Sequence, residues 1–475
     1  MEGGRRETLR RLALLMAATA ALKLFFVWRY PGFLTGDDLE PVETAGRHAI
    51  GLRYQPWDIR SLFHSLVFVW PAVKAAALAG ARDPRAITQA AALPAVGFST
   101  WAVGLVYALA RRFEASRPAA GAAAALYAFH FLPLAFGSTA YPRPVSTALL
   151  ALAFVVVSGP APTARAAWAA GALAGSAFAV RWSEGVVLLP LLASSAWRHP
   201  GRGVWLRVLA GFAVSTSLFV GAVDWATWGR PFASLWAFFR TMYLEIPGSR
   251  LAGEKPFPYY GWSVLNWAGP VAILLLLGSW RDRRARRAIA IFSGVVLLMS
   301  LFAHKEWRYL QAAIPFLCVG AAFAWERLRV RFGPAAAGAV LLLGCAWGVE
   351  RANALLAKKS QPALAAARWI AALRPQPRVV ALEQTWAYGN RLYLGNDVAI
   401  REIEWQKPLT RLAMREAARD ADLLGVYEEH LSEPAREELA RLRFVEAGRF
   451  RKDAGRECVV YRRAAPAGAP AARPR

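Results

Sequence analysis

The sequence predicts an all-α polytopic membrane protein of about eleven transmembrane helices, followed by a small C-terminal α/β domain. Composition is the first observation behind this prediction. Of the 475 residues, 56% are hydrophobic and 20 are Trp, which is atypical of a disordered chain or a soluble enzyme. The second observation is a series of apolar runs that approach the roughly 20 residues needed to cross a bilayer. The third is a change after residue 350 to short strand-like and helical stretches.

The apolar runs define the expected spans. The first run follows the basic segment MEGGRRETLRR and is expected to be retained, because no small-residue cleavage site follows it. Several of the other runs are short enough to form tilted or broken helices. The expected spans are residues 11–28, 88–110, 119–137, 144–158, 166–181, 184–197, 204–225, 263–280, 288–303, 308–325 and 334–349.

The net charge of +26 does not indicate a nucleic-acid partner. Its basic residues lie in short clusters between apolar runs rather than along one polar face. Clusters of this kind set the orientation of a membrane protein, because Lys and Arg are retained on the cytoplasmic side. We therefore expect membrane lipid and no nucleic acid among the partners. The three cysteines, Cys318, Cys345 and Cys458, have no spacing typical of a zinc site or a redox pair.

Whether the apolar segment 61–80 crosses the membrane determines on which side of the membrane every later loop lies. If it does not cross, the basic loops RRFEASR, WRHPGRG, WRDRRARR and ERLRVRFG all lie on the side of the basic N-terminus. We therefore interpret 61–80 as a helix that lies on or dips into the outer face. The polar loop 30–60, the turn STAYPRP, the loop 226–262, HKEWRYL and the C-terminal domain then share the outer compartment.

Three parts of the chain are expected: a transmembrane domain over 1–350 whose first outer loop covers 29–87, an α/β domain over 351–465, and a disordered tail over 466–475. The stretches RVVALEQ, ADLLGVY, RFVEAGRF and ECVVYRR resemble strands, and SEPAREELARL is typical of a helix.

The stretch HKEWRYL carries four ionisable side chains next to an expected span. Such residues are costly near membrane depth and mark candidate functional sites. The bland interpretation is an interfacial anchor, with Trp307 and Tyr309 in the aromatic belt and Lys305 and Arg308 snorkelling. On a helix, His304 and Arg308 would share one face at i and i+4 with Lys305 beside them. Three such groups would form a phosphate site.

HKEWRYL followed by AAIPF resembles the H-K-E-x-R-F/Y motif of glycosyltransferase family 22. This is the group of Alg9-like and GPI-type mannosyltransferases of the GT-C superfamily, which use polyprenyl-phosphate-mannose. Five positions match in register. They are His304, Lys305, Glu306, Arg308 and Tyr309.

The first outer loop, TGDDLEPVETAGRHAIGLRYQPWDIRS, resembles the family's H-P-D-E, T-W-E-W and R-S elements. The stretch between W-E and R-S is shorter here, and Gly36 replaces the usual Pro before the acidic pair. The matching residues are Asp37 and Asp38 on the acidic pair, Trp57 and Asp58 on W-E, and Arg60 and Ser61 on R-S. TAYPRPVS resembles the S-R-x-L-S-N element through Arg143, and PFPYYGW, with Tyr259 and Tyr260, resembles a later W-Y-rich element. The resemblance covers about residues 10–325.

The resemblance implies inverting transfer of mannose from polyprenyl- or dolichyl-phosphate-mannose to a glycan or glycolipid acceptor. An Asp of the first outer loop would be the general base. Asp37 is our first choice and Asp38 the second, with Glu40 and Glu43 behind them; the alternative is a solvated polar surface. In this interpretation His304, Lys305 and Arg308 bind the lipid phosphate.

Other residues are expected to support the site. Glu306 would orient Lys305 or Arg308, or pair with an arginine elsewhere. Arg181 and Glu184 would form a structural ion pair or line the donor cavity. Tyr259 and Tyr260 would stack on sugar or anchor the chain at the interface. No cofactor is expected, although Asp37 with Asp38 leaves a divalent metal open.

Two alternatives remain at this point. A transferase of the same architecture could use another polyprenyl-phosphate sugar, such as a pentose, or modify protein. A lipid or solute transporter would also carry intramembrane charges, but we find no internal symmetry in the sequence. The preference for Arg over Lys and the Ala-rich composition indicate a bacterial cytoplasmic membrane, with the active site and C-terminal domain facing the periplasm.

Overall fold

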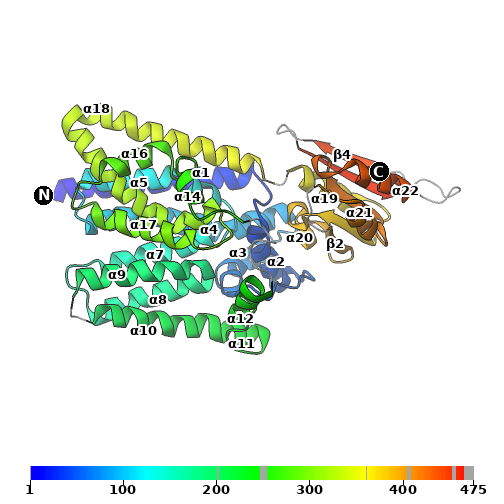
Figure 1. Ribbon diagram of the computed structural model, residues 1–475, viewed down its shortest axis with the longest axis horizontal. Helices are drawn as coiled ribbons and strands as arrows, with labels where there is room; N and C mark the ends of the chain where they lie inside the picture. Colours follow the sequence, from blue (N-terminus) through cyan, green and yellow to red (C-terminus); the bar gives the residue numbers. More distant parts are fainter. Residues whose placement is uncertain are drawn as a thin grey trace. The chain divides into compact units, whose positions relative to one another are not determined.

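The computed structural model describes residues 2–200, 203–245, 254–359, 361–403, 408–451 and 456–464 (Figure 1). The chain forms two compact units. The helical unit comprises residues 1–28, 57–69 and 92–355, and the α/β unit comprises residues 29–56, 70–91 and 356–475. The predicted first outer loop, 29–87, is therefore divided between the units. Residues 29–56 and 70–91 belong to the same unit as the C-terminal sheet.

Helices dominate the first 357 residues (Figure 1). The longer ones are α1 (Glu2–Arg29), α2 (Gly36–Ile50), α3 (Trp70–Leu78), α4 (Pro84–Arg112), α5 (Arg117–Phe129), α7 (Arg143–Val157), α8 (Ala164–Val180), α9 (Leu188–Arg198), α10 (Val204–Thr216), α16 (Pro270–Gly278), α17 (Arg286–Ser300) and α18 (Ile314–Ala357). The shorter helices are α6 (Phe131–Phe136), α11 (Val223–Trp228), α12 (Ala233–Phe239), α14 (Tyr259–Trp262) and α15 (Val264–Ala268). Further helical turns are η1 (Ser65–Val69), η2 (Trp182–Val187), η3 (Ser217–Ala222), η4 (Arg240–Glu245) and η5 (Trp307–Ala313).

Four helical stretches among the described residues are long and apolar enough to cross a membrane: Arg6–Arg29, Pro84–Arg112, Val204–Trp228 and Trp307–Ala372. The predicted number of eleven spans is not confirmed. Several predicted spans are broken, for example 119–137, which becomes α5 and α6, and 263–280, which becomes α15 and α16. The helical stretch Ser65–Leu78, within predicted segment 61–80, is apolar but shorter than a span.

Small residues let α8 and α10 pack closely in the helical unit. A Cβ atom at Gly171 would lie 2.0 Å from the carbonyl oxygen of Val208, and one at Gly211 would lie 2.3 Å from that of Trp168. Close backbone approach of this kind is typical of helix pairs in membranes. The packing holds the end of α8, from which the chain enters η2.

The α/β unit contains a five-stranded sheet of order β2-β1-β3-β5-β4. The strands are β1 (Val379–Glu383), β2 (Ala399–Ile403), β3 (Leu423–Tyr427), β4 (Phe444–Arg451) and β5 (Glu457–Arg463). Strands β2, β1 and β3 are parallel, whereas β5 is antiparallel to β3 and to β4. All four predicted strands are confirmed. Strand β2 was not predicted, because this edge strand is largely exposed and lacks a continuous apolar run.

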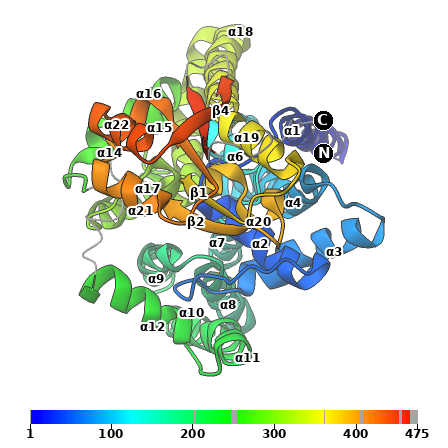
Figure 2. The same ribbon diagram turned by 90° about the vertical axis from the view of Figure 1, so that its right-hand side faces the viewer.

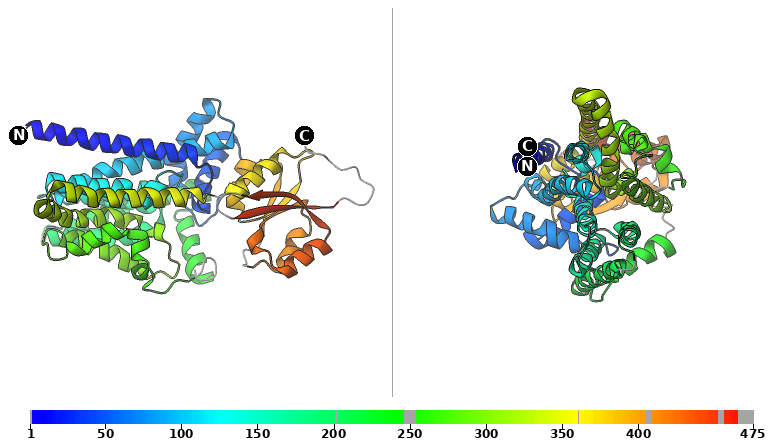
Figure 3. Two further views of the ribbon diagram at one scale, coloured as in Figure 1. Left: turned by 90° about the horizontal axis from the view of Figure 1, so that it is seen from above. Right: turned by 90° about the vertical axis from the view of Figure 1, so that its left-hand side faces the viewer.

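Helices cover both faces of the sheet. Figure 3 shows α19 (Gln361–Ala372) on one face, and α21 (Arg411–Ala418) with α22 (Glu433–Arg441) on the other. Helix α22 confirms the predicted helix in SEPAREELARL. The remaining elements of this region are α20 (Asn390–Leu394), η6 (Thr385–Tyr388) and η7 (Glu428–His430).

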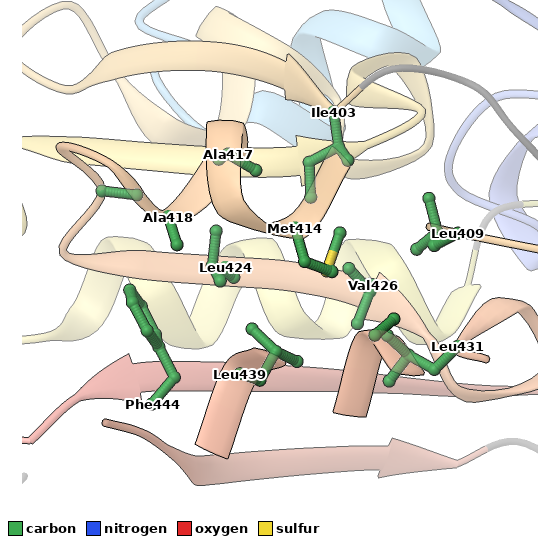
Figure 4. Packing of buried hydrophobic residues seen from close by; sticks show 13 residues of the cluster. Ile403, Leu409, Met414, Ala417, Ala418, Leu424, Val426, Leu431, Leu439 and Phe444 are labelled. Carbon is green, nitrogen blue, oxygen red and sulfur yellow. The ribbon is translucent and has the colours of Figure 1, made fainter. Parts of the chain in front are cut away.

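The face covered by α21 and α22 contains an apolar core of the α/β unit (Figure 4). Leu424 of β3 is fully buried, with Met414 of α21 and Leu439 of α22 in the same cluster. Burial of such side chains supplies most of the free energy that holds a small sheet domain together.

We expect Leu424→Ala to lower the free energy of unfolding of this unit by about 2–5 kcal/mol, because it leaves a cavity in the core. Amide hydrogen exchange of β1 and β3 would measure the loss. Leu412→Ala is the matched control, since Leu412 lies on α21 but is exposed. Equal losses for both variants would contradict the assignment of this core.

Candidate active site

Arg143 is the centre of the polar cluster in the helical unit. It lies in the first turn of α7, and its side chain and that of Glu184 are both 0% exposed. Its Nη1 lies 2.7 Å from Glu184 Oε1 and 3.2 Å from the carbonyl oxygen of Tyr309, and its Nη2 lies 2.7 Å from Ser183 Oγ. The guanidinium also lies 4.7 Å from the centre of the Tyr309 ring. One side chain thus connects α7, η2 and η5.

Residues 304–308 do not form the expected helical face. Glu306 is extended, with φ −134° and ψ 146°, and the 3-10 helix η5 begins only at Trp307. His304 and Arg308 nevertheless meet through Glu306. His304 Nε2 lies 3.2 Å from Glu306 Oε1, and Arg308 Nε pairs with Glu306 Oε2. The expected pairing of Glu306 with Arg308 is therefore present.

Lys305 has a different environment from His304 and Arg308. Its ammonium donates to the carbonyl oxygen of Lys255 at 2.9 Å and to that of Phe302. These bonds tie the chain after α17 to residue 255, which explains why the segment leaves the helical path. The side chain is buried, and this burial lowers the pKa of Lys305. The predicted convergence of His304, Lys305 and Arg308 is therefore found only for His304 and Arg308, which share Glu306, whereas Lys305 binds backbone carbonyl oxygens.

Two tyrosines line the same cluster. The guanidinium groups of Arg308 and Arg181 lie 5.5 Å and 5.8 Å from the ring centre of Tyr141. Tyr260 is buried, and its hydroxyl lies 3.1 Å from the carbonyl oxygen of Glu306. Tyr260 therefore holds the segment in place rather than presenting an exposed face for stacking. Tyr141 was not predicted, although it stands two residues before Arg143 in the same turn.

The cluster is rich in arginine. Arg143, Arg181 and Arg308 lie in it together with two glutamates, Glu184 and Glu306. Glu184 forms its ion pair with Arg143, and Arg181 acts on it as a second positive charge. The local Arg181–Glu184 pair considered from the sequence is thus replaced by a pair between distant segments. Arginine side chains are the groups that proteins use most often to bind carboxylates and phosphates, because the guanidinium offers several charged donors in one plane.

The other predicted residues of the helical unit lie near its surface. The Arg60 guanidinium is 5.7 Å from the centre of the exposed Trp57 ring, and Asp58 is also exposed. Ile59 of this turn accepts a hydrogen bond from Trp182 Nε1 at 3.2 Å, which anchors the turn to η2. Lys255 lies over the ring of Tyr259, with its Nζ 5.6 Å from the ring centre.

Asp37 and Asp38 lie in the first turn of α2, in the α/β unit, and both are buried. Thr35 is the N-cap, and Asp38 completes the capping box. Asp38 Oδ2 accepts from the Leu34 backbone N–H at 2.9 Å, and Oδ1 accepts from that of Thr35 at 2.8 Å. Both oxygens of Asp38 therefore stabilise the start of the helix. The interpretation of these carboxylates as a solvated surface is wrong, because the chain buries them.

Within the described ranges, no group of three or more His, Cys, Asp or Glu side chains could hold a metal ion. Independence from metal remains a prediction.

Residues 40–373 match the Alg9-like mannosyltransferase family. GPI mannosyltransferase 3 of Trypanosoma brucei brucei is 32% identical over 176 residues, which cover 33% of this chain and 31% of that protein. The match thus spans about a third of the length of this curated relative. The match to this relative covers a third of the chain, whereas the match to the family covers most of it.

Solved structures of glycosyltransferases share the fold. ArnT from Cupriavidus metallidurans bound to undecaprenyl phosphate has a TM-score of 0.64 at 13% identity, covering 97% of this chain and 99% of that chain. The Archaeoglobus fulgidus oligosaccharyltransferase tethered with an acceptor peptide has a TM-score of 0.55 at 12% identity, covering 97% and 75%. Arabinofuranosyltransferase AftD from Mycobacteria has a TM-score of 0.54 at 16% identity, covering 95% and 40%.

We expect Arg143→Met to destabilise the helical unit by about 3–5 kcal/mol, because it leaves the buried Glu184 carboxylate without its ion partner. The double variant Arg143→Met/Glu184→Met should recover much of this loss. Thermal unfolding in detergent would measure both. Arg198→Met is the control, because its 3.8 Å pair with Glu114 is partly exposed and should contribute less than about 1 kcal/mol. No recovery in the double variant would contradict the pairing.

Proposed function

The chain belongs to the Alg9-like mannosyltransferase family, and from this premise we propose that it transfers mannose from polyprenyl-phosphate-mannose to a glycan or glycolipid acceptor. The chain is an integral membrane glycosyltransferase. The proposed reaction inverts the anomeric carbon and takes place on the outer face of a bacterial cytoplasmic membrane.

The observation that carries this proposal is the bridge from His304 through Glu306 to Arg308. The exposed fractions are 16% for the His304 side chain, 34% for Glu306 and 11% for Arg308. The bridging carboxylate is therefore the most accessible of the three groups. The donor phosphate is a diester with one negative charge, like the carboxylate, and it gains a second negative charge as the bond to C1 breaks, so it would compete for the same donors most strongly during the transfer. In the proposal, the donor phosphate displaces Glu306 from Arg308 and His304.

Arg143 has a different task in the proposal. Its fully buried pair with Glu184 is not available for exchange with a ligand. Through its bond to the carbonyl oxygen of Tyr309 it holds η5, which carries Arg308. Arg143 is therefore a positioning residue, whereas Arg308 and His304 contact the donor.

The chemistry follows from these groups. The acceptor hydroxyl attacks C1 of mannose, its proton passes to the carboxylate of the base, and the bond from C1 to the phosphate oxygen breaks. The electron pair leaves with polyprenyl phosphate, and the cations stabilise the charge that develops there. A single displacement converts a β-linked donor into an α-linked product. Asp37 is the proposed base, as the family resemblance implies, and Asp38 is assigned to the helix cap, where both of its oxygens accept backbone hydrogen bonds.

The solved relatives support a lipid-phosphate donor. The related ArnT structure contains undecaprenyl phosphate, and an Archaeoglobus fulgidus relative contains dolichol-phosphate. No metal takes part in the proposed reaction, since the cations of the chain itself supply the charge at the phosphate.

We expect Asp37→Asn to lower kcat for mannose transfer by about 10²–10⁴, because it removes the proton acceptor. Asp38→Asn should lose less, since the amide retains one acceptor for the helix cap. Asp420→Asn is the matched control, because Asp420 lies on the surface of the same unit. The assay measures transfer of radiolabelled mannose from polyprenyl-phosphate-mannose in membranes. A larger loss for Asp38→Asn than for Asp37→Asn would reverse the assignment of the base.

We expect Arg308→Ala to raise the donor KM by about tenfold or more, because it removes a charged hydrogen-bond donor to the phosphate.

Inclusion of EDTA should leave transfer unchanged, and a complete loss that Mg²⁺ or Mn²⁺ restores would overturn the metal-free mechanism. Transfer of a pentose but not of mannose would retain the site and reject the donor. Absence of transfer with every polyprenyl-phosphate sugar and acceptor extract would reject the proposal.

A further inference from the structure

We propose that the C-terminal part of the α/β unit positions the catalytic helix α2, with Glu43 and Asn396 as its main points of attachment. The inference rests on the proposed function, because it takes Asp37 of α2 as the base. Every contact that carries it lies within the α/β unit. Figure 2 shows α2 beside α20, the short helix that receives one of these contacts.

Glu43 is the first attachment point. This buried side chain of α2 accepts a hydrogen bond from Asn390 Nδ2 at 2.9 Å and another from the backbone N–H of Leu392 at 3.2 Å. Gly389 precedes α20 at the N-cap position and has no side chain to cap the helix. Glu43 therefore accepts a backbone hydrogen bond from the first turn of α20, as the side chain of an N-cap residue usually does.

Asn396 is the second attachment point, at the other end of α2. Its Oδ1 accepts from the Arg53 backbone N–H at 2.7 Å, and its Nδ2 donates to the Gly51 carbonyl oxygen at 3.0 Å. The amide thus pairs with the backbone just after the helix, where Gly51 takes up a left-handed conformation with φ 74°. One side chain thus satisfies a backbone donor and a backbone acceptor in the turn that follows the helix.

The segment before α2 is also attached. Lys359 Nζ donates to the Tyr30 carbonyl oxygen at 3.0 Å and interacts electrostatically with Asp38. Phe33 packs edge-on against Tyr393 of α20, with 6.5 Å between ring centres. The helix that carries Asp37 is therefore held before its start, along its length and after its end.

This arrangement gives the attachment a catalytic consequence. Glu43 stands six residues after Asp37, which is about 9 Å along a helix axis. A helix transmits a tilt at one position to the others, and a displacement of about 1 Å can cost 10²-fold in rate. Loss of the Glu43 contact should therefore move the Asp37 carboxylate relative to its substrate. Glu43 acts as a positioning residue, because it contacts the protein rather than the reacting atoms.

Glu43 also gives the attachment a pH dependence. Burial raises the pKa of Glu43 to about 8. The hydrogen bonds to Glu43 and the positive charge of Arg391 on α20 act in the opposite direction, because they favour the ionised form, but burial is the larger effect. The unfolded value is about 4.5, so Glu43 contributes most to stability below that pH. Its contribution is lost as pH rises through about 8, where the folded chain acquires a buried charge. The contact between α2 and α20 should loosen on the alkaline side.

We expect Glu43→Ala to lower kcat about tenfold at pH 7 while the donor KM stays within about twofold, because the donor phosphate site is intact. Glu43→Gln should retain activity at pH 7, since its amide can pair with Asn390 after an amide flip. Because Gln does not ionise, this variant should not show the loss of activity at alkaline pH that ionisation of Glu43 causes in the wild type. Asn396→Ala tests the second attachment point independently and should also lower kcat. Glu433→Ala is the control, because Glu433 is exposed on α22.

Hydrogen exchange provides a readout that does not depend on transfer. Protection factors of residues 36–50 and 390–394 should fall at least about tenfold in Glu43→Ala, and protection in α7 and α8 should stay unchanged. In the wild type, but not in Glu43→Gln, protection of residues 36–50 should fall between pH 7 and pH 9. Unchanged protection in Glu43→Ala and Asn396→Ala would overturn the inference. Absence of mannose transfer by the wild type, with these protection changes present, would instead reject the proposed function.

Discussion

The buried ion pair between Arg143 and Glu184 is the interaction on which the polar centre of the helical unit depends. Two charges removed from water stabilise a fold only when their remaining hydrogen-bonding groups are satisfied. Ser183 and the carbonyl oxygen of Tyr309 provide two of these bonds to Arg143. Because the partners come from α7, η2 and η5, the pair brings together segments that are up to 166 residues apart.

The two glutamates of this cluster differ in exposure, and this difference distinguishes a structural residue from a candidate ligand-binding one. Glu184 has no exposed surface and is fixed to Arg143, so it serves as a permanent counter-ion. Glu306 is a third exposed and bridges His304 and Arg308, and in our proposal the donor phosphate takes its place. The difference between the two carboxylates is one of access, and it assigns a different task to each arginine.

The α/β unit adds a constraint of a different kind. The predicted first outer loop contains a capped helix, α2, and residues beyond 356 supply hydrogen bonds to this helix and to the segments on either side of it. A carboxylate that already accepts two backbone N–H groups, as Asp38 does, is tied to the integrity of the helix. In our proposal the neighbouring Asp37 is the base, and the C-terminal region then acts on catalysis through the helix that carries it.

The sequence by itself determined the helical membrane class, the family motif at HKEWRYL and four of the five strands, because these are properties of consecutive residues. It also singled out most residues of the polar cluster. Only the tertiary structure decided that Glu184 pairs with Arg143 rather than with nearby Arg181, that Lys305 binds backbone carbonyls, and that Glu43 caps a helix almost 350 residues away. Apolar periodicity and motif spacing report on local structure. The partner of a buried charge depends instead on which distant segments the packed helices and sheet bring within hydrogen-bonding distance.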